Sequence, residues 1–412
     1  MKNRLGISRD FLQQLRRMST AILTLGLSVP VGAQSLSDDI ASMISEGSTH
    51  LALRYRLESV EQDNLLKDAT ASTLRSRLSF QSAMVNKLSL AIEADSITTI
   101  GSDHYDSFAL DRYRGGYSVI ADPVGTEINV AALKFALDES SSMSLGRQRL
   151  NHASQRFLGS VGWRQNEQTM DSFSYHRQAN KLSIDYSYIW NVNRIFGGSK
   201  ASAQASDLDS ASHALNISHQ HEWGSLSGFV YALDFDNARA ASSLSYGASY
   251  NGKLQALNLF ASYARQSDYG DNPIAYDADY FTLEGSGKVG EISLLLGYEL
   301  LGSDDGKLAF STPLATLHRY QGFADMFLNT PANGIQDTYF TVSTAVDALN
   351  LASSFHRYKA AEGGQDYGDE WDVVAAYRIN AHLNVEAKFA LYNRKQFGVD
   401  TEKFWLSVNV AL

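Results

Sequence analysis

Two segments near the start of the chain place an apolar residue at every second position and arginines between them. In residues 51–57 the arginines are Arg54 and Arg56, and in residues 74–80 they are Arg75 and Arg77. Successive side chains of a β-strand point to opposite faces, so each segment predicts a strand with one apolar and one charged face. A soluble barrel points its apolar face inward, whereas a membrane barrel points it at lipid and keeps the charged face in a water-filled lumen.

The same alternation recurs along the chain and continues to the last residue, Leu412. It predicts an all-β transmembrane antiparallel β-barrel of about eighteen strands, with sixteen as the alternative. The final strand resembles the closing strand that outer-membrane barrels present to their assembly machinery, although such strands generally end in Phe. The predicted strands lie near residues 50–58, 70–83, 88–97, 127–137, 142–150, 168–176, 181–192, 210–221, 226–235, 241–251, 254–265, 276–286, 288–300, 335–346, 349–358, 369–380, 383–393 and 402–412.

Short and long connections alternate between these segments, as periplasmic turns and extracellular loops do in membrane barrels. Residues 251–253 (Asn-Gly-Lys) and 380–382 (Asn-Ala-His) predict tight turns. Long connections lie at 103–125 and 151–168, and the longest non-alternating stretch is 310–334. Because that stretch is too apolar for a free surface loop, we expect it either to fold into the lumen or to cap the barrel.

The residues before the first strand predict two further segments. Residues 1–33 have the basic start, short apolar stretch and small residues of a secretory signal peptide, with an N-terminal anchor or amphipathic helix as the alternative. Translation starting at Met18 is a further alternative. In residues 34–49, the helical spacing of Leu36, Ile40, Met43 and Ile44 predicts a periplasmic helix or plug, or else a partly ordered tail. Residues 50–412 form the predicted barrel domain.

Composition narrows the classes of function. The chain has 35 basic and 45 acidic residues and a net charge of −10; loss of residues 1–33, with five basic and one acidic residue, leaves −14. Such an acidic exported chain is a poor candidate for nucleic-acid binding. Without cysteine it forms no disulfide, thiolate metal site or thiol nucleophile. Its 21 Tyr, 19 Phe, 5 Trp and only 5 Pro suit many strands with aromatic rims.

The arginines on the predicted strands are the residues that suggest a function. If the apolar faces meet lipid, arginines opposite them line the lumen, where clustered guanidinium groups favour anions. The same face also carries carboxylates, so the alternative is paired wall charges that fix the barrel shape. The predicted pore-lining arginines in this group are Arg54, Arg56, Arg75, Arg77, Arg378 and Arg394, and the carboxylates on their face are Glu58, Glu93, Asp95, Asp185, Asp372 and Glu386.

A second positively charged segment is the Gly-Arg-Gln-Arg run at 146–149. Arg147 and Arg149 have the same parity as the apolar Met143 and Leu145. A β-bulge at Gly146 would turn one arginine inward. Without a bulge, both would lie at the lipid interface, where long arginine side chains snorkel to water.

Catalytic and metal chemistry find little support in the sequence. Serine and histidine are neighbours at 212–213, 218–219 and 354–356, but no Gly-x-Ser-x-Gly, His-Glu-x-x-His or phosphate-binding loop accompanies them. His219 and His221 share one strand face and are interpreted as polar lumen or rim residues. Loops rich in Asp and Gly are interpreted as plain loops, with bound calcium as the alternative. We therefore predict no catalytic residues, no metal site and no cofactor.

Five runs carry a resemblance to a known family: Gly-Arg-Gln-Arg-Leu at 146–150, Gln-Arg-Phe-Leu-Gly-Ser-Val-Gly-Trp-Arg-Gln-Asn at 155–166, Ile-Trp-Asn-Val-Asn-Arg-Ile-Phe-Gly at 189–197, Thr-Pro-Leu-Ala-Thr-Leu-His-Arg-Tyr at 312–320 and Thr-Pro-Ala-Asn-Gly-Ile-Gln at 330–336. Together they resemble the alginate-export family of outer-membrane barrels. That resemblance implies an eighteen-stranded monomeric channel for a polyanionic uronate polymer with an arginine-lined constriction. It makes Arg147, Arg149, Arg319 and Arg194 constriction candidates.

The sequence thus predicts a non-enzymatic channel in the outer membrane of a Gram-negative bacterium. It would passively pass anionic, alginate-like saccharides or other small anions through an arginine-lined lumen. Its expected partners are outer-membrane lipid and lipopolysaccharide, the barrel-assembly machinery and the anionic substrate, with no nucleic acid. The alternatives are a general diffusion porin without anion preference, a barrel-embedded hydrolase such as a lipase, and a closed structural or adhesion barrel plugged by residues 310–334.

Overall fold

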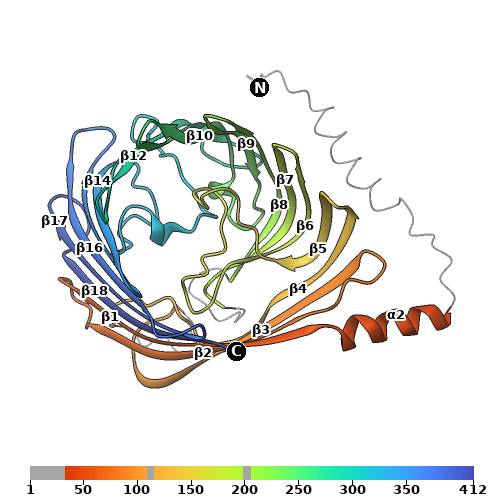
Figure 1. Cartoon of the computed structure of the whole chain (residues 1–412). Coiled ribbons are helices and arrows are strands. Elements are labelled where there is room, and N and C mark those ends of the chain that lie inside the picture. Colours follow the sequence, from red (N-terminus) through yellow and green to blue (C-terminus); the bar gives the residue numbers. More distant parts are fainter. Residues whose placement is uncertain (1–32, 109–115, 198–205) are drawn as a thin grey trace.

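The computed structural model describes residues 33–108, 116–197 and 206–412, which form a closed antiparallel β-barrel of eighteen strands (Figure 1). The predicted all-β barrel and its strand number are confirmed. The predicted signal peptide lies outside the described residues except for Ala33. The strands are β1 (Ser48–Gln62), β2 (Ala69–Gln81), β3 (Leu88–His104), β4 (Gly125–Asp138), β5 (Ser141–Gln148), β6 (Thr169–Ala179), β7 (Leu182–Asn193), β8 (Asp207–His221), β9 (Gly224–Leu233), β10 (Ser243–Leu254), β11 (Leu257–Asp268), β12 (Asp277–Val289), β13 (Ile292–Leu301), β14 (Ile335–Val346), β15 (Leu349–Lys359), β16 (Asp366–Arg378), β17 (Leu383–Arg394) and β18 (Thr401–Ala411).

The barrel closes where β1 pairs with β18, in a continuous register from Ala52 opposite Ala411 to Gln62 opposite Thr401. Each strand otherwise pairs with its neighbours in sequence. Closure leaves no strand edge with unpaired backbone groups, which a chain crossing a hydrocarbon layer requires.

The alternation seen in the sequence separates the two faces of this wall. Large apolar side chains stand exposed on the outside, as lipid contact requires, because exposing them to water would be unfavourable by about 25 cal/mol for each Å². Polar and charged side chains point inward. The exposed outward residues include Leu78, Ile92, Leu133, Leu283, Leu296, Phe340 and Trp371.

Connections of different length occupy the two rims. At one rim, called here the short-turn rim, most hairpins close with two residues, such as 139–140 and 347–348. The prediction of a turn at 251–253 is wrong: these residues belong to β10, and the turn is Gln255–Ala256 with Gln255 at φ 57°. Pairing of β10 with β11 continues to Leu254 opposite Leu257, so the ladder extends past the Asn-Gly pair.

Two long connections turn into the barrel, loop 149–168 after β5 and loop 302–334 after β13. Figure 1 shows both inside the ring of strands. Loop 302–334 contains the one-turn helix η2 (Leu317–Arg319), and a second one-turn helix, η1 (Arg239–Ala241), precedes β10. Of the two alternatives for residues 310–334, folding into the lumen is confirmed.

Helix α2 (Ala33–Ser45) precedes β1 at the short-turn rim. The spacing of Leu36, Ile40 and Ile44 therefore marks a real helix rather than an unordered tail. No helix among the described residues has the length and apolar character needed to cross a membrane.

Candidate functional site

The two inward loops pack on each other in the lumen. Gly159 N donates to Leu314 O at 2.8 Å, and Thr316 N donates to Gln155 O at 3.1 Å. The indole of Trp163 stacks on the imidazole of His318 with ring centroids 3.5 Å apart. Main-chain and ring contacts thus join segments far apart in sequence into one unit that narrows the lumen.

Aromatic packing fixes this unit to the barrel wall. The ring of Phe157 in loop 149–168 lies 4.8 Å from that of Phe229 on β9 and 5.4 Å from that of Tyr280 on β12. Phe327 in loop 302–334 packs in the same way, 4.6 Å from Tyr358 on β15. A hydrophobic core therefore lies inside the barrel, between loops and wall.

Four arginines of β1 and β2 form what we call the arginine wall: Arg54, Arg56, Arg75 and Arg77. Arg54 donates to the carbonyl oxygens of residues 162, 163 and 164 at 3.1–3.2 Å, and Arg56 donates to that of Trp163 at 2.5 Å. Arg75 lies directly opposite Arg54, and within the described residues its Nε and Nη1 have no hydrogen-bond partner. These arginines point inward, but two of them are occupied in holding loop 149–168.

Arg77 and Arg149 share a group of carboxylates. Arg77 Nη2 lies 2.6 Å from Asp95 and 2.5 Å from Glu167, and Arg149 contacts both Glu93 and Glu167. Burial raises the pKa of Glu167, but the two guanidinium groups outweigh burial and hold that pKa below its ordinary value. Although three carboxylates meet here, the two arginines already balance most of their charge.

Two further arginines anchor loop 149–168 in the interior. Arg156 pairs with Glu299 at 2.6 Å, and Arg164 pairs with Glu58 at 3.0 Å and lies 3.6 Å from Asp325. Burial by itself lowers the pKa of both guanidinium groups, but these carboxylates outweigh it and the net shift is upward. Both arginines therefore act as permanent cations at the centre of ion-pair networks.

A group of inward carboxylates on β13, β14 and β16 forms what we call the carboxylate wall: Glu299, Asp337, Glu370 and Asp372. Glu370 Oε1 accepts the backbone N–H of Ala324 at 2.6 Å, and Asp372 Oδ2 accepts that of Phe323 at 3.1 Å. The carboxylate wall therefore holds loop 302–334 through its N–H groups.

The anchor of loop 302–334 also includes His318 and Asp325. His318 Nδ1 lies 2.9 Å from Asp325 Oδ1, and Lys403 Nζ lies 3.2 Å from Asp325 Oδ2. Burial lowers the pKa of His318 to about 3, so the imidazole is neutral and donates a hydrogen bond rather than forming an ion pair. Burial raises the pKa of Asp325, but Lys403, His318 and Arg164 outweigh burial, and the carboxylate stays ionised.

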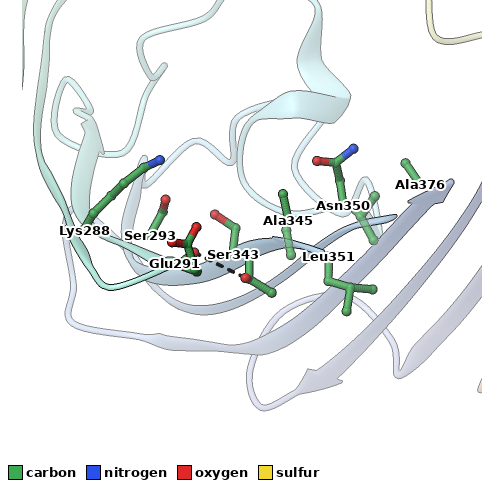
Figure 2. A pocket seen from close by; sticks show the side chains of 11 residues that line it. Lys288, Glu291, Ser293, Ser343, Ala345, Asn350, Leu351 and Ala376 are labelled. Carbon is green, nitrogen blue, oxygen red and sulfur yellow. Dashed lines mark hydrogen bonds between the residues drawn. The ribbon is translucent and has the colours of Figure 1, made fainter. Parts of the chain in front are cut away.

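A cavity of about 920 Å³ lies between the inward loops and the wall of β7 to β15. Arg319 and Tyr320 of loop 302–334 line it, together with hydroxyl and amide side chains of the wall. A second cavity of about 390 Å³ lies at the short-turn rim, where Lys288 and Glu291 stand beside the small side chains of Ser343 and Ala345 (Figure 2). The lumen thus has polar cavities beside the inward loops and at the short-turn rim.

The other predicted arginines are dispersed. Arg319 is exposed and lines the larger cavity. Arg194 follows β7, and its guanidinium lies 4.5 Å from the centre of the Phe196 ring. Arg378 and Arg394 are exposed at opposite ends of the wall, in β16 and β17. None of these four joins the arginine wall.

Arg147 does not reach the lumen. It lies opposite Ala131, next to the pair of Leu133 with Leu145, and this register has no shift at Gly146. Without a bulge, Arg147 keeps the outward parity and pairs with Asp171 at 2.8 Å on the outer face. Arg149 faces inward because β5 ends at Gln148 and the chain turns into the lumen. The prediction of Arg147 as a pore-lining residue is therefore wrong.

Sequence reasoning missed Arg156, Arg164, Lys403 and the pair of His318 with Asp325 as lumen residues. Arg156 and Arg164 lie in the 155–166 run, which was noted as a motif. Because apolar and polar residues do not alternate in that run, the sequence did not predict which way these side chains point. The histidines near serines contact other partners: His213 Nδ1 lies 2.9 Å from the Tyr186 hydroxyl, His219 Nδ1 lies 3.0 Å from His221 Nε2, and His356 binds Asp337.

Comparison with solved structures identifies the fold. OccAB4 of Acinetobacter baumannii superposes with a TM-score of 0.67 over 89% of this chain and 98% of that chain, at 14% identity. OccK9 (OpdG) of Pseudomonas aeruginosa gives 0.69 over 90% and 99%, at 16% identity, and the P. aeruginosa outer membrane protein opdK gives 0.68 over 90% and 99%, at 14% identity.

The chain therefore has the fold of the outer-membrane porins. At these identities the likeness shows the fold alone, and it does not single out the alginate-export family. No protein-family model matches the chain. No curated protein matches its sequence.

Proposed function

We propose that the protein is a passive channel in the outer membrane of a Gram-negative bacterium, and that it favours small carboxylate-bearing solutes such as anionic, uronate-like saccharides. The porin fold supports the channel. The exposed guanidinium of Arg319 in the larger cavity supports the preference for anions.

The proposed preference for anions rests on the position of Arg319. This residue lines the cavity with an exposed side chain, and no carboxylate within the described part of the chain lies at ion-pair distance from it. Each carboxylate lining the cavity, by contrast, already accepts a hydrogen bond from a neighbour. The donors are His176 for Asp185, Tyr339 for Glu284, Arg156 for Glu299 and His356 for Asp337.

The mechanism follows from these charges. A carboxylate entering the cavity finds a fixed guanidinium that donates two parallel hydrogen bonds, which lowers the electrostatic barrier to an anion. The carboxylates nearby keep the attraction weak, so that the solute is released again. No step requires a covalent change in the solute.

A general diffusion porin without anion preference is the second candidate. It is favoured by the occupation of four other lumen arginines, because Arg77, Arg149, Arg156 and Arg164 all pair with carboxylates. If those pairs dominate the field in the lumen, Arg319 alone contributes little.

Reversal potentials across planar bilayers under a KCl gradient separate the two candidates. We expect chloride to permeate more readily than potassium, and Arg319→Gln to reduce this ratio about twofold, since one charge across about 8 Å of water contributes about 0.5 kcal/mol. Arg265→Gln is the matched control, because Arg265 is half-buried on the outer face of β11 and pairs with Asp277 and Asp279. A reversal potential of zero for the unmodified protein, or equal shifts for both variants, contradicts the anion preference and favours the general porin.

A further inference from the structure

Helix α2 carries an apolar face that no other part of the described chain covers. Leu36, Ile40 and Ile44 are spaced four residues apart and therefore lie along one side of the helix, with 52%, 48% and 61% of their surfaces exposed. Asp38 lies on the opposite side, about 160° around the helix axis from Ile40 at 100° per residue. The helix is thus amphipathic without a protein surface on its apolar side.

Two hydrogen bonds tie this helix to the turn between β2 and β3. Ala83 N donates to Met43 O at 3.0 Å, and Asn86 Nδ2 donates to Asp39 Oδ2 at 2.8 Å. The turn belongs to the short-turn rim, so α2 is held at that level of the barrel.

The joint between α2 and β1 fixes the side of the wall on which the helix lies. A Cβ atom on Gly47 would come within 2.6 Å of the Phe80 ring, so the chain runs closely against that ring here. Phe80 pairs with Ile92 on the outward face, next to the exposed Leu78. The chain therefore enters the barrel across its outer, apolar surface and not through the lumen.

The direction of the helix completes the geometry. In Figure 1 the ring of strands is seen end-on while α2 is seen from the side, running outward from the wall near β3. Its axis thus lies across the barrel axis, along the plane that a membrane around the barrel would occupy.

We propose that α2 lies in the headgroup and acyl-chain boundary of the membrane leaflet at the short-turn rim, with Leu36, Ile40 and Ile44 in the acyl region. The occupant of the apolar face is phospholipid, because this face continues the exposed apolar surface of the barrel through Met84, which is 54% exposed, and Leu88. Tethering to the barrel holds the helix at the interface, so that a short apolar stripe suffices.

The charges of the helix specify the lipid further. Its residues include Asp38 and Asp39 but no lysine or arginine. Attraction to anionic headgroups therefore makes no contribution, and zwitterionic lipid such as phosphatidylethanolamine is the preferred surface. The proposal rests on the membrane-spanning barrel but is independent of the ion selectivity of the channel.

Nitroxide labels on single cysteines test this placement directly, because the natural chain has no cysteine. The full-length protein carrying Ile40→Cys or the matched Asp38→Cys is reconstituted in vesicles of phosphatidylethanolamine with a minor fraction of phosphatidylglycerol. Electron paramagnetic resonance then measures collisions with oxygen, which concentrates in lipid, and with a water-soluble nickel chelate. We expect the oxygen-to-nickel ratio to be severalfold higher at position 40 than at position 38, and unchanged by high salt.

A third label, Leu283→Cys on the exposed face of β12, reports whether the barrel itself is in lipid. If positions 40 and 38 are equally accessible to the nickel chelate while position 283 is lipid-exposed, α2 lies in water and the proposal is wrong, although the channel stands. If position 40 is shielded from both probes, a protein surface covers the helix, which also overturns the proposal. A water-exposed label at 283 would contradict both the helix placement and the membrane channel.

Discussion

The arginine wall and the carboxylate wall solve the same problem with opposite charges. Arg54 and Arg56 donate to carbonyl oxygens of loop 149–168, whereas Glu370 and Asp372 accept N–H groups of loop 302–334. A loop folded into a lumen has backbone groups that no regular structure satisfies, and leaving them unpaired is unfavourable. The comparison shows that a charge on an inward strand face is first a partner for loop backbone and only then a candidate for contact with solute.

The largest expected effect is on the arginine side, where Arg164→Leu leaves the buried Glu58 without its cation and removes one of the two cations at Asp122. Removing one partner from a buried ion-pair network is unfavourable by about 3–5 kcal/mol. We expect loop 149–168 to detach from the wall, with faster amide hydrogen exchange over residues 155–168 and noisy single-channel currents. Unchanged exchange in that segment would show that aromatic packing, and not the ion pairs, holds the loop.

The corresponding substitution in the carboxylate wall is Glu370→Ala. It removes the acceptor of the Ala324 N–H, and a buried N–H without a partner is unfavourable by about 1–3 kcal/mol. We expect faster amide exchange over residues 322–328, while exchange in loop 149–168 changes less. Glu370→Gln is the matched control, because its amide oxygen still accepts the hydrogen bond. Equal effects of the two variants would mean that charge, rather than the hydrogen bond, anchors the loop.

Acidification provides a third way to compare the two loops. The pKa of His318 is about 3 when the loop is docked and near 6.5 when it is released, so the released loop binds more protons between these values. Docking of loop 302–334 is therefore strongest above pH 6.5 and weakens by at most about 1.4 kcal/mol for each pH unit below it. The pKa of Asp325 lies below its ordinary value, so its own loss of stability begins only below about pH 4.

Amide exchange of residues 310–328 between pH 6.5 and 4.5, corrected for the intrinsic effect of pH, measures this change. His318→Asn keeps a donor for Asp325 but does not titrate, so its docking should be independent of pH in this window. A pH dependence that persists in His318→Asn would assign the effect to another group.

The sequence predicted the barrel better than its lumen, for a physical reason. Alternation with period two reports the face of every strand residue, and the inward placement of Arg54 and Arg77 followed from it directly. Loop residues such as Arg156 and Asp325 have no such period, and their partners come from distant strands. Which arginine is occupied by a carboxylate and which, like Arg319, is free depends on those long-range contacts.

Arg147 shows that alternation alone cannot predict the face of a residue when a glycine that could form a bulge precedes it. A bulge at Gly146 would have reversed the face of Arg147, and the registers of β5 with β4 and with β6 exclude one. Parity alone would place Arg149 on the outer face as well, but β5 ends at Gln148, and Arg149 contacts the inward Glu93 and Glu167. Parity is informative inside a strand and has no meaning one residue beyond its end.

The smallest expected effect tests this assignment of faces. Arg147→Gln removes a partly exposed ion pair with Asp171 on the outer surface, and such pairs contribute only about 0–1 kcal/mol. Because the side chain lies on the lipid side of the wall, we expect the reversal potential to equal that of the unmodified protein, in contrast to the shift expected for Arg319→Gln. A shift as large as that of Arg319→Gln would place the Arg147 charge in the lumen and require a register different from the pairing of Ala131 with Arg147.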